Sequence, residues 1–188
     1  MHRIMLALFL VMATTAAPLY AQVDTLSQAD TLAADAKKLF EAKDYKLALD
    51  KYTQAYSTYP QAKFVFGIAS CYEALGNLPR ALDAYEMFNQ YEPTKEILAR
   101  IDTEIKKLKN KLSLEYGEVF IFSSPSTAQL IIDEISKQNV YQTPARRWLK
   151  EGEHAIYFQK EGCVPRELRI QVERGEHIYV YAGLKPQN

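Results

Sequence analysis

An internal repeat constrains the fold of this chain more than any other feature. The segments AKKLFEAKDYKLALDKYTQAYSTYP (residues 36–60) and ASCYEALGNLPRALDAYEMFNQYEP (residues 69–93) align without gaps, with every aligned pair 33 residues apart. In each segment, small or apolar residues recur at helical spacing before and after a short break, AKDY in the first and LGNL in the second. The repeat therefore predicts two units, each made of a helix, a tight turn and an antiparallel helix.

The aligned positions carry residue types that suit packed helices. Alanine is expected where two helices approach closely, and these positions are Ala36, Ala48, Ala69 and Ala81. Tyr52 and Tyr85 are large enough to fill a gap between helix pairs. Pro60 and Pro93 stop the second helix of each unit because proline cannot continue a helix.

This pattern, over residues 29–93, resembles the tetratricopeptide repeat. It departs from that family in that Leu32 stands where tryptophan is frequent, Phe88 replaces a usual alanine, and the period is one residue short. The resemblance implies that the first helix of each unit lines a concave surface that binds a partner protein or an extended peptide. Carried over by position, that surface consists of Lys37, Phe40, Glu41, Lys63, Phe66, Ser70 and Glu73. Lysines beside phenylalanines suit an acidic or C-terminal peptide with an apolar anchor, although the phenylalanines are equally expected to pack between helices.

Two repeats are few for a stable array, and the next segment supplies a further apolar face. Residues 95–112, KEILARIDTEIKKLKNKL, predict one more helix that covers the open end of the array. Its apolar stripe consists of Ile97, Ile101, Ile105, Leu108 and Leu112. The opposite face pairs acidic with basic residues at i,i+4, which indicates a solvated surface.

The periodicity changes from helical to alternating after residue 116, which predicts a β module. Five strands are expected, over residues 118–123, 127–133, 154–160, 166–173 and 177–183. The first two are expected to form one hairpin, and residues 173–176 to form the hairpin turn between the last two. The chain is therefore expected to be α+β with two domains, a helical domain at residues 22–112 and a small antiparallel β-sandwich at residues 113–188.

Residues 117–185 resemble the PEGA domain, a small β-sandwich module of bacterial envelope and surface proteins. The matching positions are Ser123 or Ser124, Pro125, Ala128, Asp133, Thr143, Pro144, Gly152 and Gly162. Ser126 and Thr127 occupy the places of the glutamate and glycine that give the family its name, and the segment before Thr143 is longer than usual. The resemblance implies a fold and a location, and it implies no reaction. Asp133 is expected to accept hydrogen bonds from nearby backbone N–H groups.

The stretch ARRWLK, residues 145–150, surrounds the chain's one tryptophan with basic residues. If exposed, Trp148 is suited to stack on sugar rings or to anchor a protein interface. If buried, Trp148 closes one end of the sandwich and the arginines lie in solvent. Burial is the more frequent arrangement for such a residue.

The first residues, MHRIMLALFLVMATTAAPLYAQ, have a basic start, a short apolar run and a small-residue end. This order predicts a secretory signal peptide over residues 1–21, and an exported, periplasmic or envelope-associated mature chain without a transmembrane span. A retained anchor is the alternative. In an oxidising compartment a disulfide is conceivable, but Cys71 and Cys163 fall in different modules and are interpreted as buried apolar residues.

The charge balance and the missing motifs narrow the function. Basic and acidic residues number 23 each, which gives no field for nucleic acid. The sequence contains no metal-ligand, phosphate-loop or nucleophile motif, so we expect no enzyme and no cofactor. The leading hypothesis is a non-enzymatic adaptor or scaffold of the bacterial cell envelope. The alternatives are a carbohydrate or peptidoglycan binding protein that acts through the β module, and an accessory subunit of an envelope enzyme or secretion machine.

Overall fold

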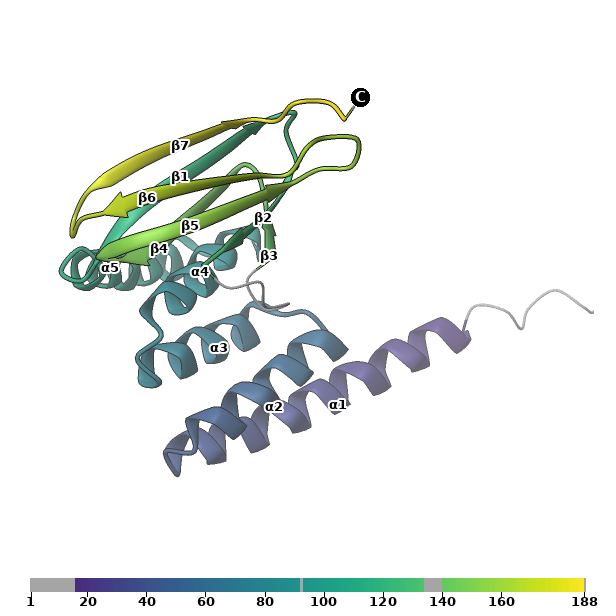
Figure 1. Cartoon of the computed structure of the whole chain (residues 1–188). Coiled ribbons are helices and arrows are strands. Elements are labelled where there is room, and N and C mark those ends of the chain that lie inside the picture. The colour runs from purple at the N-terminus through teal and green to yellow at the C-terminus, as the bar shows by residue number, and fades with distance from the viewer. Residues whose placement is uncertain (1–15, 92, 134–139, 188) are drawn as a thin grey trace, which may run out of the picture. The chain divides into compact units, whose positions relative to one another are not determined.

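The computed structural model of the chain describes residues 16–91, 93–133 and 140–187 (Figure 1). These residues form helices first and strands afterwards, which confirms the expected α+β organisation. They divide into two compact units, one of residues 16–77 and 87–91, and one of residues 78–86 and 93–187. The sequence-based domain boundaries, at residues 21 and 112, stay predictions, and most of the predicted signal segment lies outside the described residues.

The first unit, here called the helical unit, contains three α-helices and a short 3-10 helix. They are α1 (Ala16–Glu41), α2 (Tyr45–Thr58), α3 (Ala62–Ala74) and η1 (Phe88–Tyr91). The breaks fall where the repeat predicted them. Asp44 caps α2 by accepting the Leu47 N–H at 3.3 Å, and Gly76, at φ 74°, ends the turn after α3.

Small side chains let the helices of this unit approach closely, as predicted. Ala36, Ala48 and Ala69 are fully buried. Tyr52 of α2 lies over Gly67 of α3, where a Cβ atom would come within 2.7 Å of the tyrosine ring. Only glycine fits at that position without displacing the ring.

The second unit, here called the sandwich unit, combines two helices with seven strands. The helices are α4 (Leu78–Met87, of which Leu78–Glu86 belong to this unit) and α5 (Lys95–Leu112). The strands are β1 (Tyr116–Ser124), β2 (Gln129–Ile132), β3 (Val140–Gln142), β4 (Ala145–Lys150), β5 (Gly152–Gln159), β6 (Arg166–Val172) and β7 (His177–Gly183). Among the apolar residues of α5, Ile101, Leu108 and Leu112 are buried as expected, whereas Ile97 is 40% exposed. That α3 and α4 form the second repeat, and that α5 covers the array, stay predictions.

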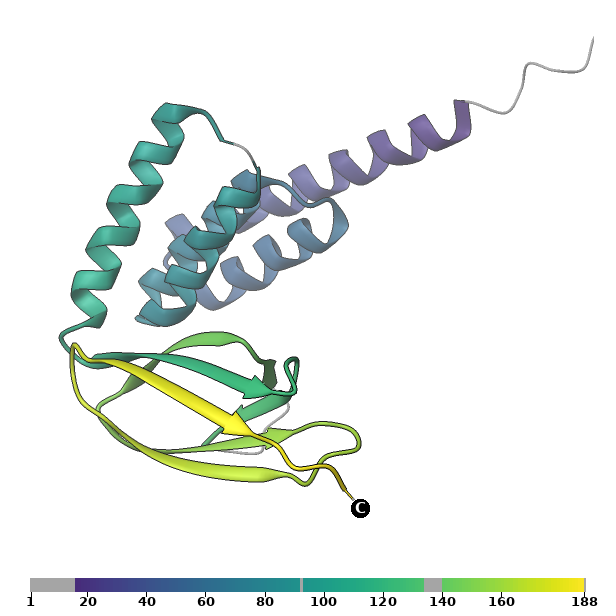
Figure 2. The ribbon, with the colours of Figure 1, turned by 90° about the horizontal axis from the view of Figure 1, so that it is seen from above.

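The strands form two sheets, in the orders β4-β1-β7 and β3-β2-β5-β6 (Figure 2). The pairings are antiparallel except that β1 and β7 run parallel, so the first sheet is mixed. Both sheets contribute to one core, whose largest fully buried residues are Phe158, Ile121, Leu130, Ile156, Val119 and Val172.

Two predicted hairpins are wrong. β1 and β2 lie in different sheets, and so do β6 and β7. The turn at residues 173–176 bonds to the start of β1 instead, through Gly175 N–H to Tyr116 C=O (2.9 Å) and Glu118 N–H to Glu176 C=O (2.8 Å). An alternating pattern shows which face of a strand is apolar, and it does not show whether two such faces share a sheet or oppose each other across a core.

Two strands were not predicted. β3 is only three residues long, and β4 contains the arginine-rich stretch ARRWLK. β4 pairs along its whole length with β1, and its two arginines pair with Asp83 and Glu86 of α4 in the same unit.

Candidate functional site

The predicted groove residues of α3 lie along one face of that helix. Lys63, Phe66, Ser70 and Glu73 are spaced by three, four and three residues, which places them on successive turns of one side. Phe66 is 40% exposed, and Ser70 and Glu73 are half-buried. This face therefore presents a partly exposed aromatic ring between a basic and an acidic side chain.

An ion pair connects this face to α1. Lys63 Nζ lies 2.7 Å from Asp30 Oδ1, and both side chains are about half exposed. The pair shows that α1 and α3 are neighbours in the helical unit. The sequence did not predict Asp30, because its ion-pair partner Lys63 lies 33 positions later in the chain and no local pattern connects the two residues.

The predicted residues of α1 lie one turn or more beyond Asp30. Lys37 pairs with Glu41 at 3.9 Å on its own helix, and both side chains are exposed. Phe40 is half-buried and meets Tyr45 edge to face, with ring centroids 5.1 Å apart. Phe40 thus packs on the α1–α2 turn, and Phe66 is the more exposed of the two rings.

Lys37 and Lys63 of the predicted groove each form an ion pair, and both pairs are weak. Both ion pairs are solvent-exposed, and such pairs contribute about 0–1 kcal/mol. A carboxylate of a ligand can therefore replace Asp30 or Glu41 at little cost. The electrostatics remain compatible with an acidic peptide, although the net field of the face is smaller than two unpaired lysines would give.

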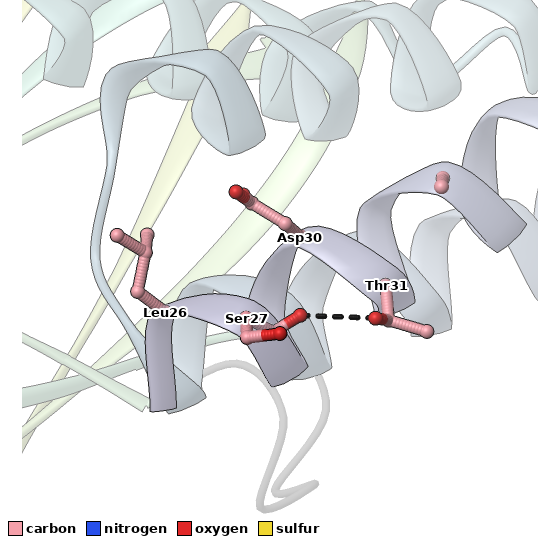
Figure 3. Close-up of a pocket in the computed structure, with 5 residues that line it drawn as sticks. Leu26, Ser27, Asp30 and Thr31 are labelled. Atoms are coloured by element: carbon pink, nitrogen blue, oxygen red, sulfur yellow. Dashed lines mark hydrogen bonds between the residues drawn. The ribbon is translucent and has the colours of Figure 1, made fainter. Parts of the chain in front are cut away.

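A shallow depression lies on the side of α1 that carries Asp30 (Figure 3). It is lined by Leu26, Ser27, Asp30, Thr31 and Ala34, and Thr31 Oγ1 donates to the Ser27 carbonyl at 2.9 Å. The depression is open to solvent and is formed by side chains of a single helix. It extends the Asp30–Lys63 region and does not enclose a small ligand.

Trp148 of β4 is half-buried, and its indole nitrogen is buried and has no hydrogen-bond partner among the described residues. Its basic neighbours face acidic residues of the sandwich unit. Arg146 pairs with Glu86 of α4 and with Glu118 of β1 (3.5 Å), and Arg147 pairs with Asp83 of α4 (3.9 Å). Two of the three basic residues around Trp148 are therefore already paired within the sandwich unit, and Lys150 is exposed.

Several positions of the PEGA resemblance converge in two polar clusters. Thr143 is buried, and its hydroxyl contacts Ser123 Oγ (2.6 Å) and accepts the Ala128 N–H (3.0 Å). At the other cluster, Asp133 accepts the Ala155 N–H (3.1 Å), as expected, and also contacts His154 Nδ1 (2.8 Å). His154 Nε2 lies 2.7 Å from the Lys150 carbonyl, so both ring nitrogens are engaged and neither is placed to activate a nucleophile.

Both cysteines are buried thiols, as interpreted from the sequence. Burial raises the pKa of the Cys71 thiol to about 11, which makes it a poor nucleophile at neutral pH. Within the described residues, no three His, Cys, Asp or Glu side chains come close enough together to hold a metal ion. None of the helices in that part of the chain is both long enough and apolar enough to cross a membrane.

Comparison of the sequence with protein-family models and with curated proteins gives no match. The resemblances to the tetratricopeptide repeat and to the PEGA domain therefore depend on the residues and spacings given above.

Proposed function

We propose that this protein is a non-enzymatic adaptor of the bacterial cell envelope that binds an extended peptide of a partner protein with the α1–α3 face. We define this face as Asp30, Lys37, Glu41, Lys63, Phe66, Ser70 and Glu73. The observation that carries the proposal is the exposed Phe66 beside the exchangeable Lys63–Asp30 pair. An accessible aromatic ring with a cation next to it suits a peptide that has an apolar anchor and a carboxylate.

The helical architecture also supports the proposal. The breaks at residues 42–44 and 75–77 and the buried alanines fit the register of the repeat. In repeat arrays of this kind, the first helices of successive units form the binding surface, and here an ion pair joins α1 to α3. Export and an envelope location are part of the proposal and depend on the N-terminal sequence and the PEGA resemblance.

The two alternatives have less support. A glycan site at Trp148 is disfavoured because Arg146 and Arg147 are paired within the sandwich unit. The role of accessory subunit of an envelope machine uses the same protein-binding face, so the experiment below tests it together with the adaptor.

The test is site-specific photo-crosslinking in the native cell. A photoreactive phenylalanine analogue at position 66 should give a defined crosslinked protein, and the additional change Lys63→Glu should abolish the product. The matched control places the analogue at Leu47, which is 50% exposed on α2, together with Lys46→Glu. Equal products from positions 66 and 47, or no effect of Lys63→Glu, would contradict the proposed face.

A peptide array then identifies the ligand chemistry. Acidic peptides with a free C-terminal carboxylate and one large apolar residue should bind the purified protein, and amidated or neutral versions should bind at least tenfold more weakly. Replacement of Phe66 by alanine should weaken binding by a similar factor. Equal binding of amidated and free peptides would remove the carboxylate from the proposal.

A further inference from the structure

The edge strands of the sandwich unit differ in how well their length and sequence prevent pairing with another chain. Unpaired strand edges tend to pair with other chains unless they are short, charged or interrupted by proline. β3 is three residues long, β4 carries Arg146, Arg147 and Lys150, and β6 carries Arg166, Glu167 and Arg169. β7, with the sequence HIYVYAG, has seven residues and none of Lys, Arg, Asp, Glu or Pro. Among the described strands, β7 is the edge without these protections along residues 177–183; directly after it, the Val164 N–H donates to the Lys185 carbonyl (2.8 Å) and the Gln187 N–H to the Gly162 carbonyl (2.9 Å).

The hydrogen bonds of β7 show which of its backbone groups are open. The Glu118 N–H donates to the Glu176 carbonyl, and the Leu184 N–H donates to the Ser124 carbonyl. These two bonds determine which residues of β7 direct their backbone groups toward β1 in the parallel ladder. Residues 178, 180 and 182 direct their N–H and C=O groups toward β1. Residues 177, 179, 181 and 183 direct theirs away from β1, and of these the Gly183 carbonyl accepts from Arg166 Nη1 at 2.9 Å.

The outer face of β7 is aromatic and exposed. Tyr179 is 71% exposed and Tyr181 is 63% exposed. On the neighbouring strand β1, Phe120 stacks on Tyr179 with ring centroids 5.0 Å apart, and Phe122 is also exposed. The opposite face of β7 is apolar and belongs to the core, through Ile178, Val180 and Ala182. A strand added beyond β7 would therefore meet apolar or aromatic groups on both faces.

We propose that β7 pairs antiparallel with β7 of a second copy of this chain, about a two-fold axis at Val180. In this register Tyr179 lies opposite Tyr181 of the second copy, and His177 lies opposite Gly183. Tyr179 and Tyr181, whose backbone groups point away from β1, thus meet each other, whereas at the His177–Gly183 pair the Gly183 carbonyl would have to exchange its bond from Arg166. The two three-stranded sheets join into one continuous sheet. No charge opposes a like charge along the seam, and the facing tyrosines add cross-strand aromatic contacts.

The size of the exposed surface indicates how strong this dimer is. A tyrosine side chain buries roughly 150–250 Å² when it is fully covered. At the exposures given above, the four tyrosines of two copies offer on the order of 400–700 Å², whereas stable interfaces bury about 1,200–2,000 Å². The dimer is therefore reversible and concentration-dependent. None of its residues belongs to the α1–α3 face, so the inference does not depend on the proposed function.

Sedimentation equilibrium of the full chain over a wide concentration range tests the proposal. The mass should rise from one chain toward two. The variant Tyr179→Lys/Tyr181→Lys places lysines opposite each other and should weaken association at least tenfold, with unchanged circular dichroism. The matched control Val140→Lys, at an exposed apolar residue of the edge strand β3, should leave association unchanged. A single-chain mass at every concentration, or an equal effect of both changes, would overturn the proposal.

Two further measurements test the register. The Lys/Lys variant mixed with Tyr179→Glu/Tyr181→Glu should restore dimers that neither variant forms alone. In addition, an oxidised mixture of the single variants Tyr179→Cys and Tyr181→Cys should form a disulfide dimer more readily than either variant by itself, because directly opposed residues lie about 5.5 Å apart at Cα. If the mixtures behave as the separate variants do, the antiparallel β7 seam is wrong.

Discussion

The interiors of the two units are built from different side chains. In the helical unit, small residues are prominent among the fully buried positions, including Ala29, Ala36, Ala48, Ala55 and Ala69. In the sandwich unit, the buried positions are mostly large and branched, as with Ile121, Leu130, Ile156 and Val172. The helical unit is stabilised by the close approach of its helices, and the sandwich unit by the apolar surface buried between its two sheets. The helical unit should therefore be sensitive to added volume, and the sandwich unit to removed volume.

The largest expected effect is a truncation in the sandwich core. Phe158→Ala removes a ring that is almost fully buried and should destabilise the sandwich unit by about 3–5 kcal/mol. The chain's one tryptophan, Trp148, lies in this unit, so its fluorescence during urea unfolding measures the loss. The exposed Phe122→Ala should change little. Because α4 and α5 belong to the sandwich unit, part of the helical circular dichroism should be lost with the tryptophan signal. Loss of the whole helical signal in that step would show that the two interiors are not independent.

The next effect concerns the polar interior of the sandwich. Thr143→Val keeps the shape of the side chain and removes the acceptor of the buried Ala128 N–H, which should cost about 1–3 kcal/mol. Tryptophan fluorescence in urea again gives the measurement. The exposed Thr103→Val on α5 is the control and should stay within about 0.5 kcal/mol of the unchanged protein. Equal losses from both would show that the Thr143 hydroxyl is not a structural acceptor.

The converse experiment adds volume to the helical unit. Gly67→Ala puts a methyl group within 2.7 Å of the Tyr52 ring and should destabilise that unit by about 1–3 kcal/mol. Circular dichroism during thermal unfolding provides the measurement. A double variant with Tyr52→Ala should lose less than the sum of the two single changes, because the clash no longer exists. Strict additivity would mean that the ring and the glycine do not interact.

The smallest effect is confined to alkaline pH and to the helical unit. Burial and the hydrogen bond to Tyr56 (2.8 Å) raise the pKa of Tyr91 to about 12, from an unperturbed value of 10.0. The stability from this pair is present in full below pH 10.0 and is lost as the pH rises through about 12. Tyr91→Phe should cost about 0.5–1.5 kcal/mol at neutral pH and should reduce the further loss in alkali. Urea unfolding by circular dichroism across this range tests it, and an unchanged pH profile would contradict the assignment.

The features that the sequence predicted are those with a local cause. The helix breaks were predictable from AKDY and LGNL, because turn residues and caps act within a few positions. The buried alanines followed from the repeat, and five strands followed from alternation. In the candidate site, Lys63, Phe66, Ser70 and Glu73 were carried over from the tetratricopeptide resemblance, and their helical spacing places them on one face of α3.

The features that were missed depend on contacts between distant segments. β4 was not recognised because its arginines pair with residues of α4 that lie sixty or more positions earlier in the chain, Arg146 with Glu86 and Arg147 with Asp83. The parallel pairing of β1 with β7 joins the first and last strands of the sandwich, and alternation carries no information about it. Asp30 was missed for the same reason, because its role arises only when α3 packs beside α1.

Each unit is formed by two separate segments of the chain, which affects how the protein can be divided into fragments. The polypeptide crosses from one unit to the other at residues 77/78, 86/87 and 92/93. A cut at 86/87 would divide both units, a cut at 92/93 would remove residues 78–86 from the sandwich unit, and a cut at 77/78 would remove residues 87–92 from the helical unit. A fragment that starts at residue 113 would also lose Asp83, Glu86 and Lys109, and the arginines of β4 would be left without their helical counterions. A single truncation at any of these crossings is thus expected to leave at least one unit incomplete.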